Sequence, residues 1–301
     1  MSQNKIAKEL DVNQSTISRE LRRNLGKRGY RYKQANKIAT ERRSNTHKSI
    51  KMTDNLKNLI EEKIRLDWSP EQISGWFACE KKLRISHQTI YEPIWADKRC
   101  GGQLFQHLRR KGKAYRPRNT DKQAGRGFIK NRVSIDERPA VVDKKTRVGD
   151  WGIDLVIGAN HSGALLTIVE RKLSFTVSKQ VNDKSAKTVT AATIELLTPY
   201  KESVLTITAD NGKEFAYHEE VSEALKCGYY FADPYGSWQR GLNENTNGLL
   251  RQSWPKGTDL KQVTQQEVDN VLLKLNNRPR KKLKYEMPAK LMAEHRVAIA
   301  A

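Results

Sequence analysis

The sequence has few cysteines and no long apolar run. Its three cysteines, Cys79, Cys100 and Cys227, are odd in number and far apart, so they form neither a disulfide framework nor a Cys-x-x-Cys metal half-site. No apolar stretch approaches the roughly 20 residues of a membrane span, and the polar N-terminus does not resemble a signal peptide. We therefore expect no membrane partner and a protein of the reducing cytoplasm.

Acidic residues are scarce in the first half of the chain. The 301 residues include 56 Lys and Arg against 34 Asp and Glu, a net charge of +22. Residues 1–140 contain 33 Lys and Arg against 15 Asp and Glu, whereas residues 141–301 contain 23 against 19. A polyanion is the natural partner of such a charge. The asymmetry predicts that the N-terminal half binds it, with double-stranded DNA in the nucleoid as the expected polyanion.

Residues 2–23 predict two short helices joined by a tight turn. Their shared core would be formed by spaced apolar residues, Ile6, Ala7, Leu10, Val12, Ile17 and Leu21. Asn13 is a good N-cap for the second helix. This is the pattern of a helix-turn-helix whose second helix reads the major groove, with a plain helical hairpin as the alternative. The candidate DNA-contacting residues are Gln14, Ser15, Thr16, Ser18, Arg19, Arg22 and Arg23. Because Met1 opens directly onto the first helix, residues 1–50 are interpreted as a truncated first unit and a basic helical segment.

A second helix-turn-helix is predicted over residues 51–103. Ser69 as N-cap, Pro70 at the first helical position and Gln72 at the third fit a capping box. Another capped helix begins after Ser86, and its first residues, His87 and Gln88, would face the groove.

Residues 104–132 form a basic linker between the two halves. The linker is dense in Arg, Lys and Gly, and it includes Arg109 and Arg110 as candidate DNA contacts. It would track DNA phosphates, and a solvated tether is the alternative.

Residues 133–301 predict an α/β domain. Expected strands cover 151–158, 164–169, 175–181, 204–209 and 229–232, and expected helices cover 187–197, 219–226 and a segment carrying Glu244. This order is that of the ribonuclease-H-like (integrase-type) fold with a mixed five-stranded sheet. In that fold the first strand neighbours the fourth, so Asp154 is expected beside Asp210.

Carboxylates stand at two suggestive positions in this domain. Asp210 follows a buried strand, and Glu244 shares one predicted helix face with Arg240, Asn247 and Arg251, because their spacing is four, three and four residues. A carboxylate at a strand end and another on a helix face can converge, which is the outline of a metal site. The alternatives are a turn-forming aspartate and a solvated glutamate.

Seven short motifs resemble those of the DDE transposases of the insertion-sequence-30 family of bacterial mobile elements, and the match covers nearly the whole chain. They are Thr-Ile-Ser-Arg-Glu-Leu (16–21), Trp-Ser-Pro-Glu-Gln-Ile (68–73), Ile-Ser-His-Gln-Thr-Ile-Tyr (85–91), Asn-Arg-Val-Ser-Ile (131–135), Ala-Asp-Asn-Gly (209–212), Asn-Glu-Asn-Thr-Asn-Gly (243–248) and Asn-Asn-Arg-Pro-Arg-Lys (276–281). The resemblance implies DNA strand cleavage and strand transfer at terminal inverted repeats, by a homo-oligomer on DNA. The sequence departs from the family pattern at Gly152 and Ile153.

The resemblance also implies the site chemistry. Asp154, Asp210 and Glu244 would be the catalytic triad and would bind two Mg²⁺ or Mn²⁺ ions, for which carboxylates are suitable ligands. Arg240 and Arg251 would hold DNA phosphates or balance the charge of the triad. Three other functions stay open. They are a helix-turn-helix regulator without catalysis, an inactive truncated transposase copy, and a nuclease of the same fold that cuts without joining.

Overall fold

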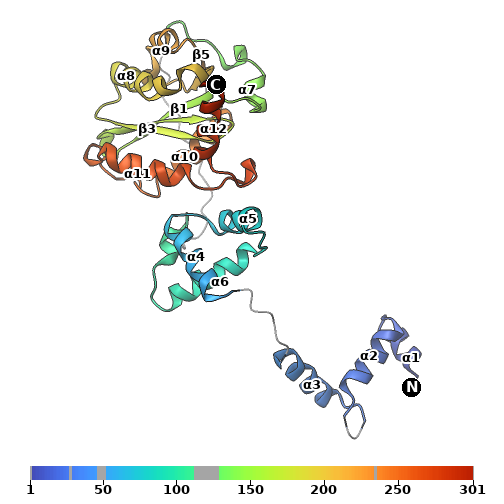
Figure 1. The fold of residues 1–301 in the computed structure, drawn as a ribbon. Helices are drawn as coiled ribbons and strands as arrows, with labels where there is room; N and C mark the ends of the chain where they lie inside the picture. Colours follow the sequence, from blue (N-terminus) through green and yellow to red (C-terminus); the bar gives the residue numbers. More distant parts are fainter. Residues whose placement is uncertain (1, 27–28, 46–51, 112–128, 234–235, 301) are drawn as a thin grey trace. The chain divides into compact units, whose positions relative to one another are not determined.

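The computed structural model describes residues 2–26, 29–45, 52–111, 129–233 and 236–300 (Figure 1). The chain divides into two compact units, Met1–Thr53 and Asp54–Ala301. Most of the predicted basic linker lies outside the described residues. None of the described helices is both long enough and apolar enough to cross a membrane.

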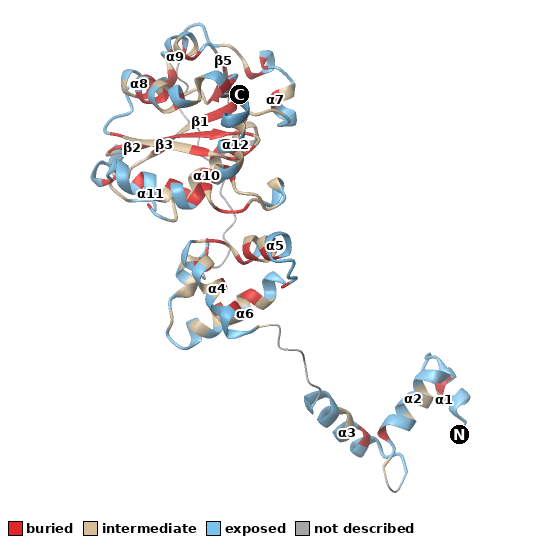
Figure 2. Ribbon diagram, in the orientation of Figure 1, coloured by how far each residue is buried: buried red, intermediate tan, exposed pale blue. Residues whose placement is uncertain are grey.

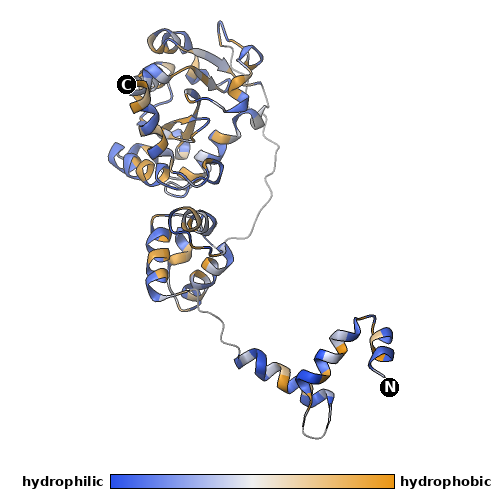
Figure 3. Cartoon of the chain, turned by 45° about the vertical axis from the view of Figure 1, so that its right-hand side comes forward, coloured by the Kyte–Doolittle hydropathy of each residue, from blue (hydrophilic) through white to orange (hydrophobic). Residues whose placement is uncertain are grey.

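The first unit contains α1 (Gln3–Glu9), α2 (Gln14–Asn24) and α3 (Tyr32–Asn45). As predicted, Asn13 caps α2, because its Oδ1 accepts a hydrogen bond from the Ser15 amide at 2.9 Å. Ala7 is 4% exposed where α1 packs on α2, but Leu10 is 62% exposed. Polar residues dominate all three helices (Figure 3). The small core indicates that this unit has limited stability of its own.

The second unit begins with three helices, α4 (Asp54–Arg65), α5 (Pro70–Glu80) and α6 (His87–Arg99). Ser69 and Gln72 form the predicted capping box at the start of α5, and Ser86 caps α6. The helices enclose a core of aliphatic and aromatic side chains that are at most 3% exposed: Ile60, Ile64, Ile73, Phe77, Ile90 and Ile94. A short 3₁₀ helix, Leu104–His107, packs against α4 and α6.

A five-stranded sheet forms the centre of the remaining residues. Its strands are β1 (Asp150–Ile157), β2 (Ala164–Glu170), β3 (Thr176–Val181), β4 (Thr206–Ala209) and β5 (Gly228–Phe231), in the spatial order β3-β2-β1-β4-β5. The first three strands form an antiparallel meander, whereas β4 runs parallel to β1 and β5 runs parallel to β4. Both the meander and the pairing of the first strand with the fourth are as predicted.

Helices cover both faces of the sheet. One face packs against α8 (Ala186–Leu197) and α9 (His218–Leu225), with Met292 of α12 (Pro288–Ala300) in the same core. The other face packs against α10 (Gly241–Leu250) and α11 (Gln265–Asn276). The central strands are buried between these layers (Figure 2). A short helix, α7 (Val141–Lys144), precedes β1. The layers and strand order are those of the ribonuclease-H-like fold.

Candidate active site

The sheet register brings two carboxylates together. Gly152 of β1 is paired with Thr208 of β4, and the same parallel register continued by two residues sets Asp154 beside Asp210. Asp210 follows the last residue of β4 and closes a turn, because its Oδ1 accepts the Gly212 amide at 3.1 Å. Asp154 lies on the opposite face of β1 from Ile153, and so it points toward α10.

The helix α10 packs closely against β1. A Cβ atom at Gly152 would overlap Oδ1 of Asn243, which is only 1% exposed beneath the helix. Further along α10, Asn247 donates from Nδ2 to Asp154 Oδ2 at 2.8 Å and accepts from Thr167 Oγ1 at 3.0 Å. The asparagine thus fixes one oxygen of Asp154 and links it to β2.

Arg240 connects the two aspartates. Its Nη1 lies 3.3 Å from Asp154 Oδ1 and 3.2 Å from Asp210 Oδ2, at the N-cap of α10. This nitrogen is buried and makes no directed hydrogen bond within the described part of the chain, so the contacts are mainly electrostatic. Two carboxylates therefore converge on a single cationic group. Two hard oxygen donors that share one cation also fit Mg²⁺, which proteins commonly hold through one or two carboxylates.

Burial perturbs Asp154 strongly. It raises the pKa of the Asp154 carboxyl from 3.8 to about 6; Arg240 opposes this shift, and the neighbouring Asp210 adds to it. A carboxyl group with a raised pKa beside a second carboxylate is a common feature of functional sites, and this pair lies in the interior of the sheet, where β4 ends next to β1.

Glu244 is half-buried on α10, between Arg240 and Asn247 in sequence. Among the residues that the structure describes, no three His, Cys, Asp or Glu side chains lie close enough to hold a metal ion together. The structure thus brings Asp154 and Asp210 together, and it leaves Glu244 on the neighbouring helix without completing a three-carboxylate group.

The candidate groove-facing residues are mostly exposed. Gln14, Ser15, Thr16, Arg19, Arg22 and Arg23 of α2 are exposed and Ser18 is half-buried. Arg19 folds back on the first turn, donating to the carbonyl and hydroxyl oxygens of Ser15 at 3.0 Å each. In the second unit, His87 and Gln88 are exposed at the first turn of α6. Both helix starts are N-capped and accessible.

The remaining basic candidates differ in their surroundings. Arg109 and Arg110 are exposed, and Arg109 donates from Nη1 to Asn245 Oδ1 of α10 at 3.0 Å. Arg251 donates from Nη2 to the Ile157 carbonyl at 2.7 Å, which ties the end of α10 to the end of β1. Arg251 therefore has a structural contact that its position on the predicted helix face did not reveal.

Two arginines to which the sequence assigned no role lie near α10. Arg278 donates from Nη1 to Gln252 Oε1 at 3.3 Å and Arg280 donates from Nη2 to the Leu275 carbonyl at 3.1 Å. Both belong to the motif 276–281, which is the signal that could have drawn attention to them. Their surroundings are built from segments far apart in the sequence, which local periodicity does not reveal.

The chain is similar to several curated transposases. It is 45% identical over 290 residues to the transposase for insertion sequence element IS4351 of Bacteroides fragilis, covering 96% of this chain and 89% of the relative. Identity is 40% over 303 residues to transposase InsI for element IS30A of Escherichia coli (strain K12), covering 97% and 79%. It is 36% over 304 residues to the transposase for element IS1086 of Cupriavidus metallidurans, covering 96% and 88%.

The comparisons with family models and with solved structures add no family assignment. No protein-family model matches the chain. Among solved structures, the catalytic core domain of BIV integrase is 19% identical with a TM-score of 0.40, covering 51% of this chain and 99% of that chain.

Proposed function

The chain belongs to the insertion-sequence-30 family of transposases, and from this membership we propose that it binds the inverted repeats at the ends of an insertion sequence and catalyses metal-dependent cleavage and joining of DNA strands. The observation that carries the proposal is the convergence of Asp154 and Asp210 on one cationic group where β4 ends beside β1. Carboxylates in this arrangement suit phosphodiester chemistry, because they can hold divalent cations against DNA phosphate oxygens.

Asp154, Asp210 and Glu244 are the proposed catalytic and metal-binding residues. Asp154 and Asp210 would hold Mg²⁺ or Mn²⁺, as two ions, with Glu244 contributing from α10. When bound, the ions would activate the attacking oxygen and stabilise the leaving oxygen.

The chain's own residues prepare this site. Asn247 fixes Oδ2 of Asp154, while Oδ1 accepts the Leu155 amide at 2.9 Å and faces Arg240. Arg240 balances the negative charge of the pair, and we assign it to a DNA phosphate in the complex with DNA. The close contact between Asn243 and Gly152 determines how closely α10, with Glu244, approaches β1.

DNA recognition is proposed to use the exposed starts of α2 and α6. The residues would be Gln14, Ser15, Thr16, Ser18, Arg19, Arg22 and Arg23 on α2, and His87 and Gln88 on α6, with Arg109, Arg110, Arg240 and Arg251 on phosphates. A capped helix with polar residues in its first turn is the usual reader of a major groove. The protein is proposed to act as a homo-oligomer on the element ends and the target.

An inactive copy is the less favoured reading. Gly152 and Ile153 depart from the family pattern, but Gly152 accommodates Asn243 and Ile153 is fully buried in the core. Asp154 keeps its contacts with Asn247 and Arg240. The departures are therefore compatible with an intact carboxylate pair.

The test is a cleavage and strand-transfer assay with the full chain, Mg²⁺ and a duplex carrying the ends of the element. We expect nicked products and joined products, both abolished by EDTA. Binding without cleavage would instead identify a regulator or an inactive copy, and cleavage without joined products would identify a nuclease.

A further inference from the structure

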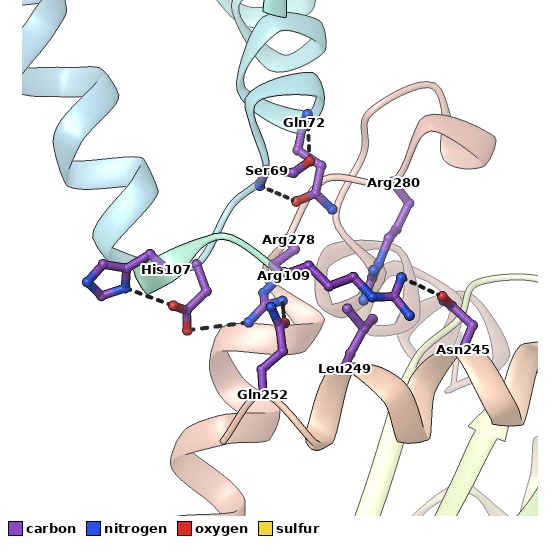
Figure 4. A pocket seen from close by; sticks show the side chains of 10 residues that line it. Ser69, Gln72, His107, Arg109, Asn245, Leu249, Gln252, Arg278 and Arg280 are labelled. Atoms are coloured by element: carbon purple, nitrogen blue, oxygen red, sulfur yellow. Dashed lines mark hydrogen bonds and ion pairs between the residues drawn. The ribbon is translucent and has the colours of Figure 1, made fainter. Parts of the chain in front are cut away.

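A hollow of about 150 Å³ lies within the unit Asp54–Ala301, where the helices α4 to α6 meet the sheet domain (Figure 4). Its walls come from segments far apart in the sequence. Ser69 and Gln72 are at the start of α5, Arg109 follows the 3₁₀ helix, and Arg278 and Arg280 follow α11. The hollow has room for several water molecules, and all of its described lining residues except Leu249 are polar or charged.

Positive charge exceeds negative charge in this hollow. Arg109, Arg278 and Arg280 line it, with Asp67 as the one carboxylate among the described lining residues. That carboxylate already has two partners, because Oδ1 lies 2.9 Å from His107 Nδ1 and Oδ2 lies 3.4 Å from Arg278 Nη2. One carboxylate cannot balance three guanidinium groups, so the hollow favours an anion.

Two of the three arginines, Arg278 and Arg280, are buried or half-buried beside the hollow. Arg278 is 6% exposed, and the Nε atoms of Arg278 and Arg280 are buried without a hydrogen-bond partner in the part of the chain that is described. Burial, together with repulsion from Arg278 and Arg109, lowers the pKa of Arg280 to about 10. Guanidinium groups that repel one another away from water are unfavourable, and the charged oxygens of an anion would relieve that repulsion.

We propose that this hollow binds one backbone phosphate of DNA. The proposal rests on the proposed function, since it takes DNA as the source of the anion. A planar guanidinium group presents N–H donors in the geometry that phosphate oxygens accept. The N-terminus of α5 also lines the hollow, and its dipole adds to the attraction for an anion.

The phosphate would join DNA binding to the active site. Arg109 donates to Asn245, the residue next to Glu244 on α10, and Gln252 beyond the end of α10 accepts from Arg278. A phosphate held between these arginines and the start of α5 would fix α10 relative to the second helix-turn-helix. Occupation of the hollow would therefore position Glu244 when DNA is bound.

The test measures the salt dependence of binding to a short duplex of arbitrary sequence by the full chain. Each phosphate contact contributes about 0.9 to the slope of log K against log salt. We expect Arg109→Gln to lower the slope by up to that amount. The double variant R109Q/R280Q should lose about 0.9 in total rather than twice that, because both arginines contact the same phosphate.

Lys274→Gln is the matched control, because it removes one exposed positive charge four residues before Arg278 without lining the hollow. An unchanged slope in R109Q/R280Q, or an equal fall in Lys274→Gln, overturns the proposal. If Arg280→Gln impairs folding, the slope is measured for Arg109→Gln alone. Arg109 is exposed, so its substitution should leave the fold intact.

Free phosphate separates the two sources of the anion. Inorganic phosphate that raises the melting temperature of the wild type but not of R109Q/R280Q, with the slope unchanged, would identify a small-anion site and contradict a DNA contact. Failure of the wild type to bind any duplex would overturn the proposed function itself. Normal wild-type binding with an unchanged variant slope would reject only the phosphate site.

Discussion

At the scale of single residues, the pair of aspartates is arranged for chemistry at the expense of stability. Asp154 is largely removed from water, and its partners compensate only in part, which is why its pKa rises to about 6. Arg240 stands between Asp154 and Asp210, where it offsets the repulsion of the two carboxylates. The family resemblance implied both aspartates and offered Arg240 and Arg251 as their charge partners; the structure shows Arg240 between the aspartates, whereas Arg251 contacts the end of β1.

The contribution of Asp154 to the stability of the metal-free protein should therefore fall as pH rises from about 4 to about 6. Over this range the folded state binds more protons than the unfolded state, because the pKa of Asp154 is raised on folding. The loss is on the order of 3 kcal/mol. Denaturant unfolding in EDTA, with wild type compared to Asp154→Asn, measures it. The stability difference between the two proteins should change across this pH range; a constant difference would contradict the account.

At the scale of elements, local sequence signals predicted where strands and helices begin, whereas tertiary contacts of individual side chains could not be predicted from the sequence. The β-branched runs and the caps at Asn13 and Ser69 predicted strands and helix starts, because those preferences depend on neighbours in sequence. The contacts of Arg251 with Ile157 and of Arg109 with Asn245 join residues far apart along the chain. No periodicity encodes such contacts, and so the surroundings of the site were less predictable than its carboxylates.

Gly152→Ala should displace α10 and lower both stability and cleavage. The new methyl group would meet buried Asn243, which has little room to move, and overpacking of this kind costs about 1–3 kcal/mol. Unfolding free energies of the single variants and of Gly152→Ala with Asn243→Ala give a coupling energy. We expect the second substitution to recover part of the loss.

Gly241→Ala serves as the control for this prediction, because among the described residues no atom outside its chain neighbours and its own helix backbone lies within 4 Å of a Cβ added there. Strictly additive effects of Gly152→Ala and Asn243→Ala would show that the close approach of α10 to β1 is not what constrains the glycine.

At the scale of the whole molecule, the two units differ in their share of the positive charge and in the size of their buried cores. The first unit, Met1–Thr53, carries 14 Lys and Arg against 4 Asp and Glu, but it has a small core. The unit Asp54–Ala301 contains the second helix trio and the sheet, each with its own buried residues. The first unit therefore contributes mainly positive charge.

A chain that starts at Met52 should fold and retain most of its preference for the ends of the element, while its salt dependence decreases. The loss of basic residues removes phosphate contacts, whereas the capped start of α6 with His87 and Gln88 is kept. Competition binding between element ends and random duplex checks both points. A loss of several kcal/mol in specificity, the scale separating specific from non-specific sites, would assign sequence reading to α2.

The central claim is that Asp154, Asp210 and Glu244 act together on DNA phosphates. The direct measurement is Mg²⁺-dependent cleavage of element-end DNA by Asp154→Asn, Asp210→Asn and Glu244→Gln, beside Glu223→Gln, an exposed carboxylate on α9. Each of the first three should fall by at least about 100-fold, the scale on which one lost transition-state contact acts, with DNA binding and folding retained. Glu223→Gln should match the wild type. Near-normal cleavage by Asp210→Asn would contradict the account.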